Sequence, residues 1–269
     1  MTEQAETWDR IANWQFVLPP SRPAMWQLAH IRRVLLKIPR SAPVAILGST
    51  PELRDLAADL GFSQIYIFEK SISAYGMMSK LRCFTNRENF VEGDWLDTLK
   101  NYTGTFAAIL SDLTSGNISY DCRETFYSFV SKALRTDGVF IDKILTHSER
   151  FDELKRLDEE FHYLPINLET FNRFSCKYYF CSELLAASME VKSEIFYEAL
   201  ASRFTHPKLT CLLTGSQLIT PPGCRWWYGK PWDTLKREYF GYLKSMRMVP
   251  DVPDSPYAQR CRLYFLRRR

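Results

Sequence analysis

The stretch VAILGSTPELRDLA, at residues 44–57, predicts a strand, a tight turn and a helix in succession. Its apolar run Val44–Leu47 ends at Gly48, and glycine tolerates the backbone angles that a tight turn requires. The helix expected over Pro51–Leu60 has proline where a first helical turn accepts it, and Gly61 follows its end. This strand, turn and helix form the first unit of a series.

Four further β-rich runs follow, with helix-length segments between several of them. They lie at Ile65–Phe68, Asn89–Val91, Phe106–Leu110 and Val139–Ile144. Strands that alternate with helical segments indicate right-handed crossovers and a parallel sheet covered on both faces. The sequence therefore predicts an α/β core, which we place at residues 41–185.

The two flanking segments have a different character from the core. Residues 1–40 carry apolar side chains around a turn-like PPSRP stretch and predict an N-terminal helical cap. Residues 186–269 predict a C-terminal cap or insertion whose last strand, Arg262–Leu266, returns to the sheet. The run Lys177–Leu184 is the alternative closing strand.

Polar side chains follow four of the predicted strands, at the edge where an open parallel sheet binds ligands. Gly48, Ser49 and Thr50 follow the first strand. Glu69 ends the second, where a carboxylate can accept hydrogen bonds from both hydroxyls of a ribose. Asp94 and Trp95 follow the third strand and offer an acceptor for an exocyclic amine beside an indole. Asp112 follows the fourth strand, facing the place of a reacting group.

From residue 41 to about 145 the chain resembles the class I S-adenosylmethionine-dependent methyltransferases. The resemblance rests on VAILGSTPELRDLA, IYIFEK, ENFVEGDWLDTL, FAAILSDLTSGN and GVFIDKI, in that order and with similar gaps. It implies a Rossmann-like fold, S-adenosyl-L-methionine as cofactor and methyl transfer as the activity.

The same resemblance assigns roles to the residues after the strands. The turn at Gly48, Ser49 and Thr50 would wrap the methionine and sugar, Glu69 would hold the ribose, Asp94 and Trp95 would contact the adenine, and Asp112 would lie near the sulfonium and the acceptor. The turn departs from the family pattern, because the family commonly has three glycines there and this chain has one. A nicotinamide-binding domain is the alternative, but GSTPEL lacks the further glycines that pyrophosphate contact requires.

Several of these residues also have a purely structural interpretation. Asp94 suits a helix N-cap and Trp95 suits the core. Asp112 and His147 are the two candidates for a base, although either residue also suits a turn or helix cap. In the fifth strand Asp142 and Lys143 alternate, so one of them is expected to face the site, and the sequence does not decide which.

The acceptor is the least determined part of the prediction. Trp227 and Tyr228, in the aromatic run RWWYGKPW, are candidates for binding a small-molecule acceptor, or they form the core of the cap. The basic end Arg267–Arg269 favours an RNA or protein acceptor instead. The glycine-poor turn favours a third alternative, a catalytically silent S-adenosylmethionine-binding or interaction protein.

Composition sets the remaining expectations. The chain has 269 residues, 46% hydrophobic and 25% charged, with a net charge of +4 that does not by itself indicate nucleic-acid binding. No apolar run is long enough to cross a membrane and the N-terminus is polar, so we expect a cytoplasmic protein without a membrane partner. Its four histidines and seven cysteines show no metal-ligand spacing, so no metal is expected. The oligomeric state is left open.

Overall fold

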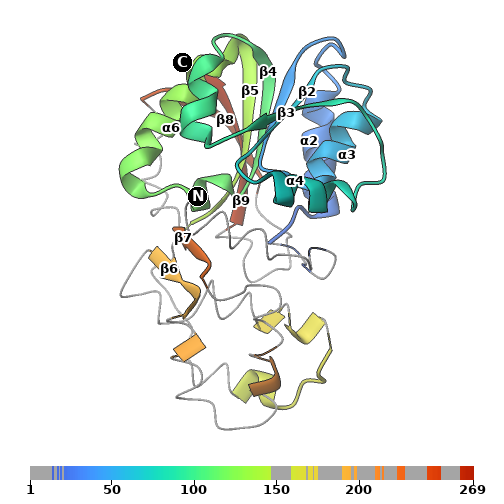
Figure 1. Ribbon diagram of the computed structural model, residues 1–269, viewed down its shortest axis with the longest axis vertical. Helices are drawn as coiled ribbons and strands as arrows, with labels where there is room; N and C mark the ends of the chain where they lie inside the picture. The colour runs from blue at the N-terminus through green and yellow to red at the C-terminus, as the bar shows by residue number, and fades with distance from the viewer. Residues whose placement is uncertain are drawn as a thin grey trace.

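The computed structural model describes residues 21–146 and several shorter pieces of the chain. These pieces are residues 14, 17 and 19, and then 159–167, 169–171, 173–174, 190–194, 197–198, 210–212, 214, 223–227, 241–249 and 261–269. The main sheet and its covering helices lie within these ranges (Figure 1).

The elements confirm the alternation that the sequence predicts. They follow in the order α2 (Met25–Leu35), β1 (Val44–Leu47), α3 (Pro51–Asp59), β2 (Ile65–Glu69), α4 (Ile72–Ser79), β3 (Glu88–Glu92), α5 (Trp95–Thr98), η2 (Leu99–Asn101), β4 (Phe106–Asp112), η3 (Thr114–Asn117), α6 (Tyr120–Ala133), β5 (Leu134–Leu145), β6 (Glu190–Lys192), β7 (Arg225–Trp227), β8 (Leu243–Val249) and β9 (Cys261–Arg268). Each of the five predicted β-rich runs lies within one of these strands.

The main sheet has seven strands in the order β3-β2-β1-β4-β5-β9-β8. Strands β1 to β5 pair in parallel, whereas β9 pairs antiparallel with both β5 and β8. The strand beside β5 is therefore β9, and the alternative at 177–184 lies outside the described residues. A dinucleotide-binding sheet has the parallel order 3-2-1-4-5-6, so the inserted antiparallel strand separates this sheet from that class.

Both faces of the sheet are covered, which explains the uninterrupted apolar sequence of β1. Val44 and Ile46 pack on one face with the helices α2 and α3, and Ala45 and Leu47 pack on the other face with α6. All four β1 residues are buried, as is typical of a parallel strand between two helical layers. The α2 residue Leu35 belongs to the same buried cluster, so α2 is part of the core layer within the segment predicted as an N-terminal cap.

A second, two-stranded sheet lies at the carboxyl edge of β1 to β5 (Figure 1). In it β6 and β7 pair antiparallel, and β7 contacts η3 of the main body. The domain limits 1–40, 41–185 and 186–269 stay predictions. In the described part of the chain, no helix is long and apolar enough to span a bilayer.

Candidate functional site

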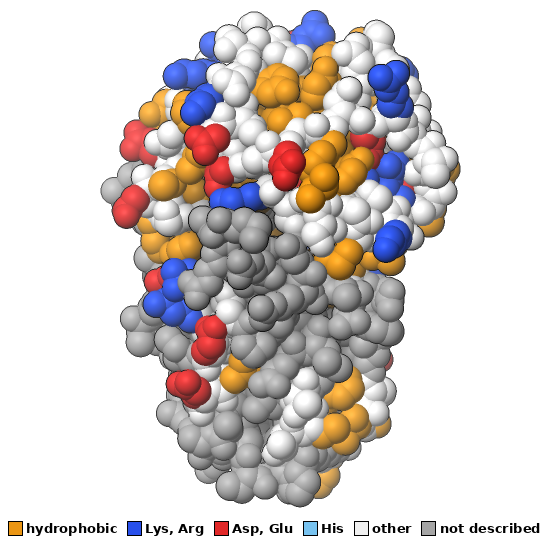
Figure 2. Space-filling view, in the orientation of Figure 1, with side chains coloured by type: hydrophobic (Ala, Val, Ile, Leu, Met, Phe, Trp, Pro, Cys, Tyr) orange, Lys and Arg blue, Asp and Glu red, His pale blue; other side chains and the backbone are white. Residues whose placement is uncertain are grey.

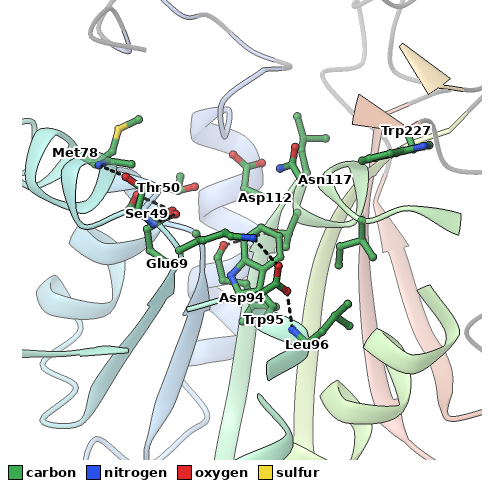
Figure 3. Close-up of a pocket in the computed structure, with 18 of the residues that line it drawn as sticks. Ser49, Thr50, Glu69, Met78, Asp94, Trp95, Leu96, Asp112, Asn117 and Trp227 are labelled. Atoms are coloured by element: carbon green, nitrogen blue, oxygen red, sulfur yellow. Dashed lines mark hydrogen bonds and ion pairs between the residues drawn. The ribbon is translucent and has the colours of Figure 1, made fainter. Parts of the chain in front are cut away.

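A pocket of about 360 Å³ opens at the carboxyl ends of the parallel strands, a size that suits a small ligand. Every described residue that the sequence analysis singled out for cofactor or acceptor binding lines this pocket (Figure 3). These residues are Gly48, Ser49, Thr50, Glu69, Asp94, Trp95, Asp112 and Trp227. The other two candidates, His147 and Tyr228, lie outside the described residues.

The turn after β1 brings backbone to the pocket wall. Gly48 has a φ of +84°, which side-chain-bearing residues rarely adopt, and its N–H donates to the Phe68 carbonyl at 2.8 Å. A Cβ added at Gly48 would meet no atom within 4 Å, so this stretch of backbone borders open space. Pro51 then starts α3 at a first-turn position. The turn needs its single glycine, and a ligand can approach it closely.

Glu69, the last residue of β2, has both carboxylate oxygens fixed by neighbouring turns. One oxygen accepts from the Ser49 hydroxyl at 3.1 Å and the other from the Ser71 backbone N–H at 3.1 Å. These two bonds orient the carboxylate, and a carboxylate can accept several hydrogen bonds, including those from the hydroxyls of a ligand.

Asp94 is the N-cap of α5, which is one of the two interpretations of the sequence, and it also pairs with a lysine at the pocket. One oxygen caps α5 by accepting from the Leu96 N–H at 3.0 Å, and the other lies 3.0 Å from the Lys70 ammonium. The Asp94 and Lys70 side chains are 39% and 36% exposed and both residues line the pocket. Sequence analysis missed Lys70, although its place directly after Glu69 was a usable signal.

Trp95 packs partly into the core and partly against the pocket. Its indole N–H donates to the Phe68 carbonyl at 2.8 Å, and the ring lies against the buried cluster beneath α6. Because the indole nitrogen already has a partner, the ring can offer a ligand only its apolar surface.

At the ends of β4 and β5, strand register decides which residue faces the pocket side. Asp112 pairs in register with Lys143, and their charged groups are 2.9 Å apart with side chains only 3% and 2% exposed. On the opposite face, the Ser111 hydroxyl donates to the buried Asp142 at 2.7 Å. Of the two alternating residues in β5, Lys143 is therefore the one beside Asp112.

The backbone directly after Asp112 is strained. Leu113 has a φ of +60°, and a non-glycine residue in this region is uncommon and tends to occur at functional sites. Its N–H donates to the Lys143 carbonyl at 3.0 Å, and the Thr114 hydroxyl donates to the Leu47 carbonyl at 3.2 Å. Bonds to β5 and β1 thus hold the turn in place.

Tyr264 of β9 lies near Asp142 on the sheet face away from Asp112. Burial raises the pKa of Tyr264 to about 12, with a smaller contribution from Asp142 and an opposing one from Arg262. The phenol therefore stays neutral near pH 7 and is not a candidate base.

The N-terminal segment adds a wall that sequence analysis missed. Trp14 and Ser21 line the pocket, and the Trp14 indole N–H donates to Glu52 of α3 at 3.3 Å. Glu52 also forms an ion pair with Arg22. These contacts join residues far apart in the chain, so no local sequence pattern predicts them.

Trp227 is held at the opposite side of the pocket by Arg123 of α6. The Arg123 guanidinium donates to the Trp227 carbonyl at 3.1 Å and to the Ile118 carbonyl at 3.2 Å, and it lies over the Tyr120 ring. Arg123 is 1% exposed, so a buried cation attaches β7 to the main body.

The basic end of the chain lies away from the pocket. Leu263 pairs with Lys143 beside the pocket, whereas Arg267 pairs with Val139 four residues further down β5. At about 3.3 Å per residue this separates Arg267 from the pocket level by about 13 Å. Lys and Arg side chains lie at that end of the molecule (Figure 2).

No group of three or more His, Cys, Asp or Glu side chains in the described part of the chain is arranged to hold a metal ion. The described cysteines, which include Cys122 at the pocket, are free thiols.

Neither a protein-family model nor a curated protein sequence matches the chain. Several solved structures are similar to the chain. A Rhodobacter sphaeroides protein provisionally named as a Zn-dependent alcohol dehydrogenase has a TM-score of 0.62 at 16% identity, with 100% of both chains covered. The N-methyltransferase NodS from Bradyrhizobium japonicum WM9, in complex with S-adenosyl-L-homocysteine, has a TM-score of 0.57 at 10% identity, with 99% of both covered. The glycopeptide N-methyltransferase MtfA, in complex with the same compound, has a TM-score of 0.52 at 15% identity, covering 93% of this chain and 92% of its own.

At these identities the likeness concerns the fold, and the names of the similar proteins differ in chemistry. The strand order separates the alternatives, because the antiparallel β9 between β5 and β8 has no place in the parallel sheet of a nicotinamide-binding domain. The chain therefore has the α/β, Rossmann-like fold of the class I S-adenosylmethionine-dependent methyltransferases.

Proposed function

We propose that the protein binds S-adenosyl-L-methionine in this pocket and transfers its methyl group to a small molecule. The observation that carries the proposal is the convergence of the residues after β1, β2, β3 and β4 on one pocket. Glu69 is the most informative of them, because two turns orient its carboxylate toward that space.

The residues present suit the cofactor. Gly48 leaves room for close approach of the methionine and sugar, Glu69 offers carboxylate oxygens for the ribose hydroxyls, and Asp94 offers an acceptor to the adenine amine. Three carboxylates and one ammonium group are among the pocket-lining side chains, which favours a ligand that carries positive charge. When bound, the cofactor supplies a methyl group on a positively charged sulfur.

The chain's own part in the reaction is to position the acceptor. Methyl transfer is an in-line displacement, so a correctly held nucleophile gains much of its rate from orientation alone. Trp14 and Trp227 border the pocket from the N-terminal segment and from β7 and would exclude water above it. A base is needed only when the nucleophile must lose a proton, and Asp112 is the described candidate for that role.

Two observations favour a small acceptor over RNA. The basic end at Arg267 lies about 13 Å from the pocket level and is not part of the pocket wall. NodS and MtfA are both named N-methyltransferases, and MtfA acts on a glycopeptide. RNA and protein remain the alternative acceptors for the test below. A cytoplasmic location stays a prediction from the sequence.

Titration calorimetry with S-adenosylmethionine, S-adenosylhomocysteine and NADH tests the cofactor. We expect binding of the first two and none of NADH. Incubation of a cell extract with the protein and methyl-labelled cofactor, followed by separation into small molecules, RNA and protein, then tests the acceptor. Label in the small-molecule fraction supports the proposal. Binding without label in any fraction would favour the catalytically silent alternative, which the single glycine of the β1 turn suggests.

A further inference from the structure

Lys143 joins three parts of the chain in one buried contact beside the pocket. Its ammonium lies 2.9 Å from the Asp112 carboxylate of β4 and donates to the Arg22 carbonyl, ahead of α2, at 3.0 Å. Its backbone carbonyl accepts from the strained Leu113. A single β5 residue therefore contacts the end of β4, the turn after it and the N-terminal segment.

Because this pair is buried, each of its charges depends energetically on the other. The Lys143 and Asp112 side chains are 2% and 3% exposed, although Asp112 also lines the pocket. Lysine is rarely so buried unless it is paired, and removal of one partner leaves a costly buried charge. Lys143 therefore interrupts the otherwise mostly apolar buried sequence VFIDKIL at the level where the Asp112 carboxylate borders the pocket.

The other charged groups nearby have partners of their own. Arg22 pairs through its guanidinium with Glu52 of α3, and Lys70 pairs with Asp94 at the β3 end. Glu69 lines the pocket with its hydrogen bonds to Ser49 and Ser71, and Asp142 lies on the opposite face with Ser111. None of these side-chain contacts involves Lys143, so a change at Lys143 alone removes none of them directly.

We propose that Lys143 is a positioning residue that keeps Asp112 charged and oriented toward the cationic part of the bound ligand. Its bond to the Arg22 carbonyl ties this arrangement to the N-terminal segment that covers the pocket. The inference rests on the proposed function, because the ligand that it names is S-adenosylmethionine, whose sulfonium and ammonium groups are both positive.

The consequence is a specific pH dependence when the cation is removed. A buried carboxylate without its cation takes up a proton more readily as the pH falls. A protonated Asp112 would no longer attract the cationic ligand, so affinity would be lost toward low pH and regained toward high pH. With Lys143 in place the carboxylate keeps its charge, and the affinity stays level over the same range.

The test is S-adenosylmethionine affinity by calorimetry from about pH 5 to 6.5, where the ligand's own amine and carboxylate stay charged. We expect a level profile for the wild type and for K143R, which keeps the cation. For K143M we expect affinity to fall by up to about tenfold per pH unit as the pH is lowered. K100M is the matched control, since Lys100 pairs with Asp97 on the surface, with side chains 50% and 75% exposed.

A level K143M profile at wild-type affinity would overturn the inference. So would a K143M profile that keeps its slope when Asp112 is also changed to Asn, since the slope must come from Asp112. If the wild type binds no S-adenosylmethionine, the proposed function itself fails. If the wild type binds it but the affinity of K143M does not change with pH, only the inference about Lys143 fails.

A second variant covers the case in which K143M does not fold. The double change D112N/K143M removes both charges, which is tolerated far better than one unpaired buried charge. We expect it to bind weakly with a level profile, and wild-type affinity would contradict the inference. We also expect faster amide exchange around Arg22 in K143M than in K100M, and equal rates would remove the link to the N-terminal segment.

Discussion

The two halves of the pocket are built in different ways. In the cofactor half, the turns after β1, β2 and β3 fix one another through short contacts such as Ser49 to Glu69 and Lys70 to Asp94. In the acceptor half, Trp14 and Trp227 come from opposite parts of the chain and are held by Glu52 and Arg123. The first half follows from the order of strands and turns, whereas the second depends on contacts between distant segments.

This contrast predicts that binding and turnover can be separated by mutation. Residues of the cofactor half should control affinity for S-adenosylmethionine, and residues of the acceptor half should control the rate of transfer.

Trp227→Ala should reduce methyl transfer by about a hundredfold, the scale of a misplaced reactant, while cofactor affinity stays unchanged. The Trp227 carbonyl, which binds Arg123, is retained in the variant. Trp226→Ala, in the same strand, is the control and should keep its activity. Turnover, cofactor affinity and melting temperature measured on both variants decide the matter. Early melting with poor cofactor binding would show that Trp227 serves the core of the cap.

Glu69→Ala should weaken S-adenosylhomocysteine binding by roughly five- to a hundredfold, because one or two hydrogen bonds to the ribose are lost. Glu92→Ala is the matched control, since Glu92 lies in register with Glu69 on the neighbouring strand and does not line the pocket. Calorimetry on both variants separates the loss of the Glu69 carboxylate from the general effect of removing a glutamate at this end of the sheet. Equal affinity of the two variants would remove Glu69 from the binding site.

Gly48→Ala should lower both stability and affinity, whereas Gly61→Ala should lower stability alone. Both glycines have positive φ, at +84° and +77°, and a Cβ meets nothing within 4 Å at either place. Each change should therefore cost about 1 kcal/mol of backbone strain. Only Gly48 borders the pocket, so thermal melts with and without ligand separate the effects. The same affinity in both variants would show that the β1 turn does not approach the ligand.

Asp94→Asn should weaken cofactor binding about fivefold, since one acceptor oxygen becomes a donor amide. Asn is also a good N-cap, so α5 should persist, and the half-exposed pair with Lys70 contributes at most about 1 kcal/mol to stability. A large drop in melting temperature with unchanged affinity would assign Asp94 to structure alone.

Charge reversal at the basic end should have the smallest effect. The double change R267E/R268E lies away from the pocket and should leave methyl transfer to a small molecule unchanged. Assay of the labelled extract fractions checks this. A selective loss of label from an RNA fraction would instead favour a nucleic-acid acceptor.

The five parallel strands and the cofactor half of the pocket could be predicted from the sequence, because local sequence patterns encode both. An apolar run followed by glycine or an acid marks a buried strand and its functional edge, as at Gly48 and Glu69. The predicted run began at Val139, whereas β5 begins at Leu134, and the residues between them, RTDG, interrupt the apolar pattern. In the structure Leu134 pairs with Phe106 across a register shift, and a neighbouring strand determines that pairing.

Other features depend on partners that no local pattern identifies. Arg54 of α3 is fully buried because Glu88 of β3 lies 2.7 Å away and Tyr75 stacks beneath its guanidinium. The choice between Asp142 and Lys143 likewise depends on the register with β4, and the role of Trp14 depends on Glu52. Each of these three features is determined by a contact between residues far apart in the sequence.

A crystal structure of the complex with S-adenosylhomocysteine tests the central claim most directly. We expect the ribose hydroxyls within hydrogen-bond distance of the Glu69 carboxylate, the adenine beside Asp94 and Trp95, and the sulfur facing the space between Asp112 and Trp227. Ligand bound elsewhere, or a ribose turned away from Glu69, would contradict the proposed site.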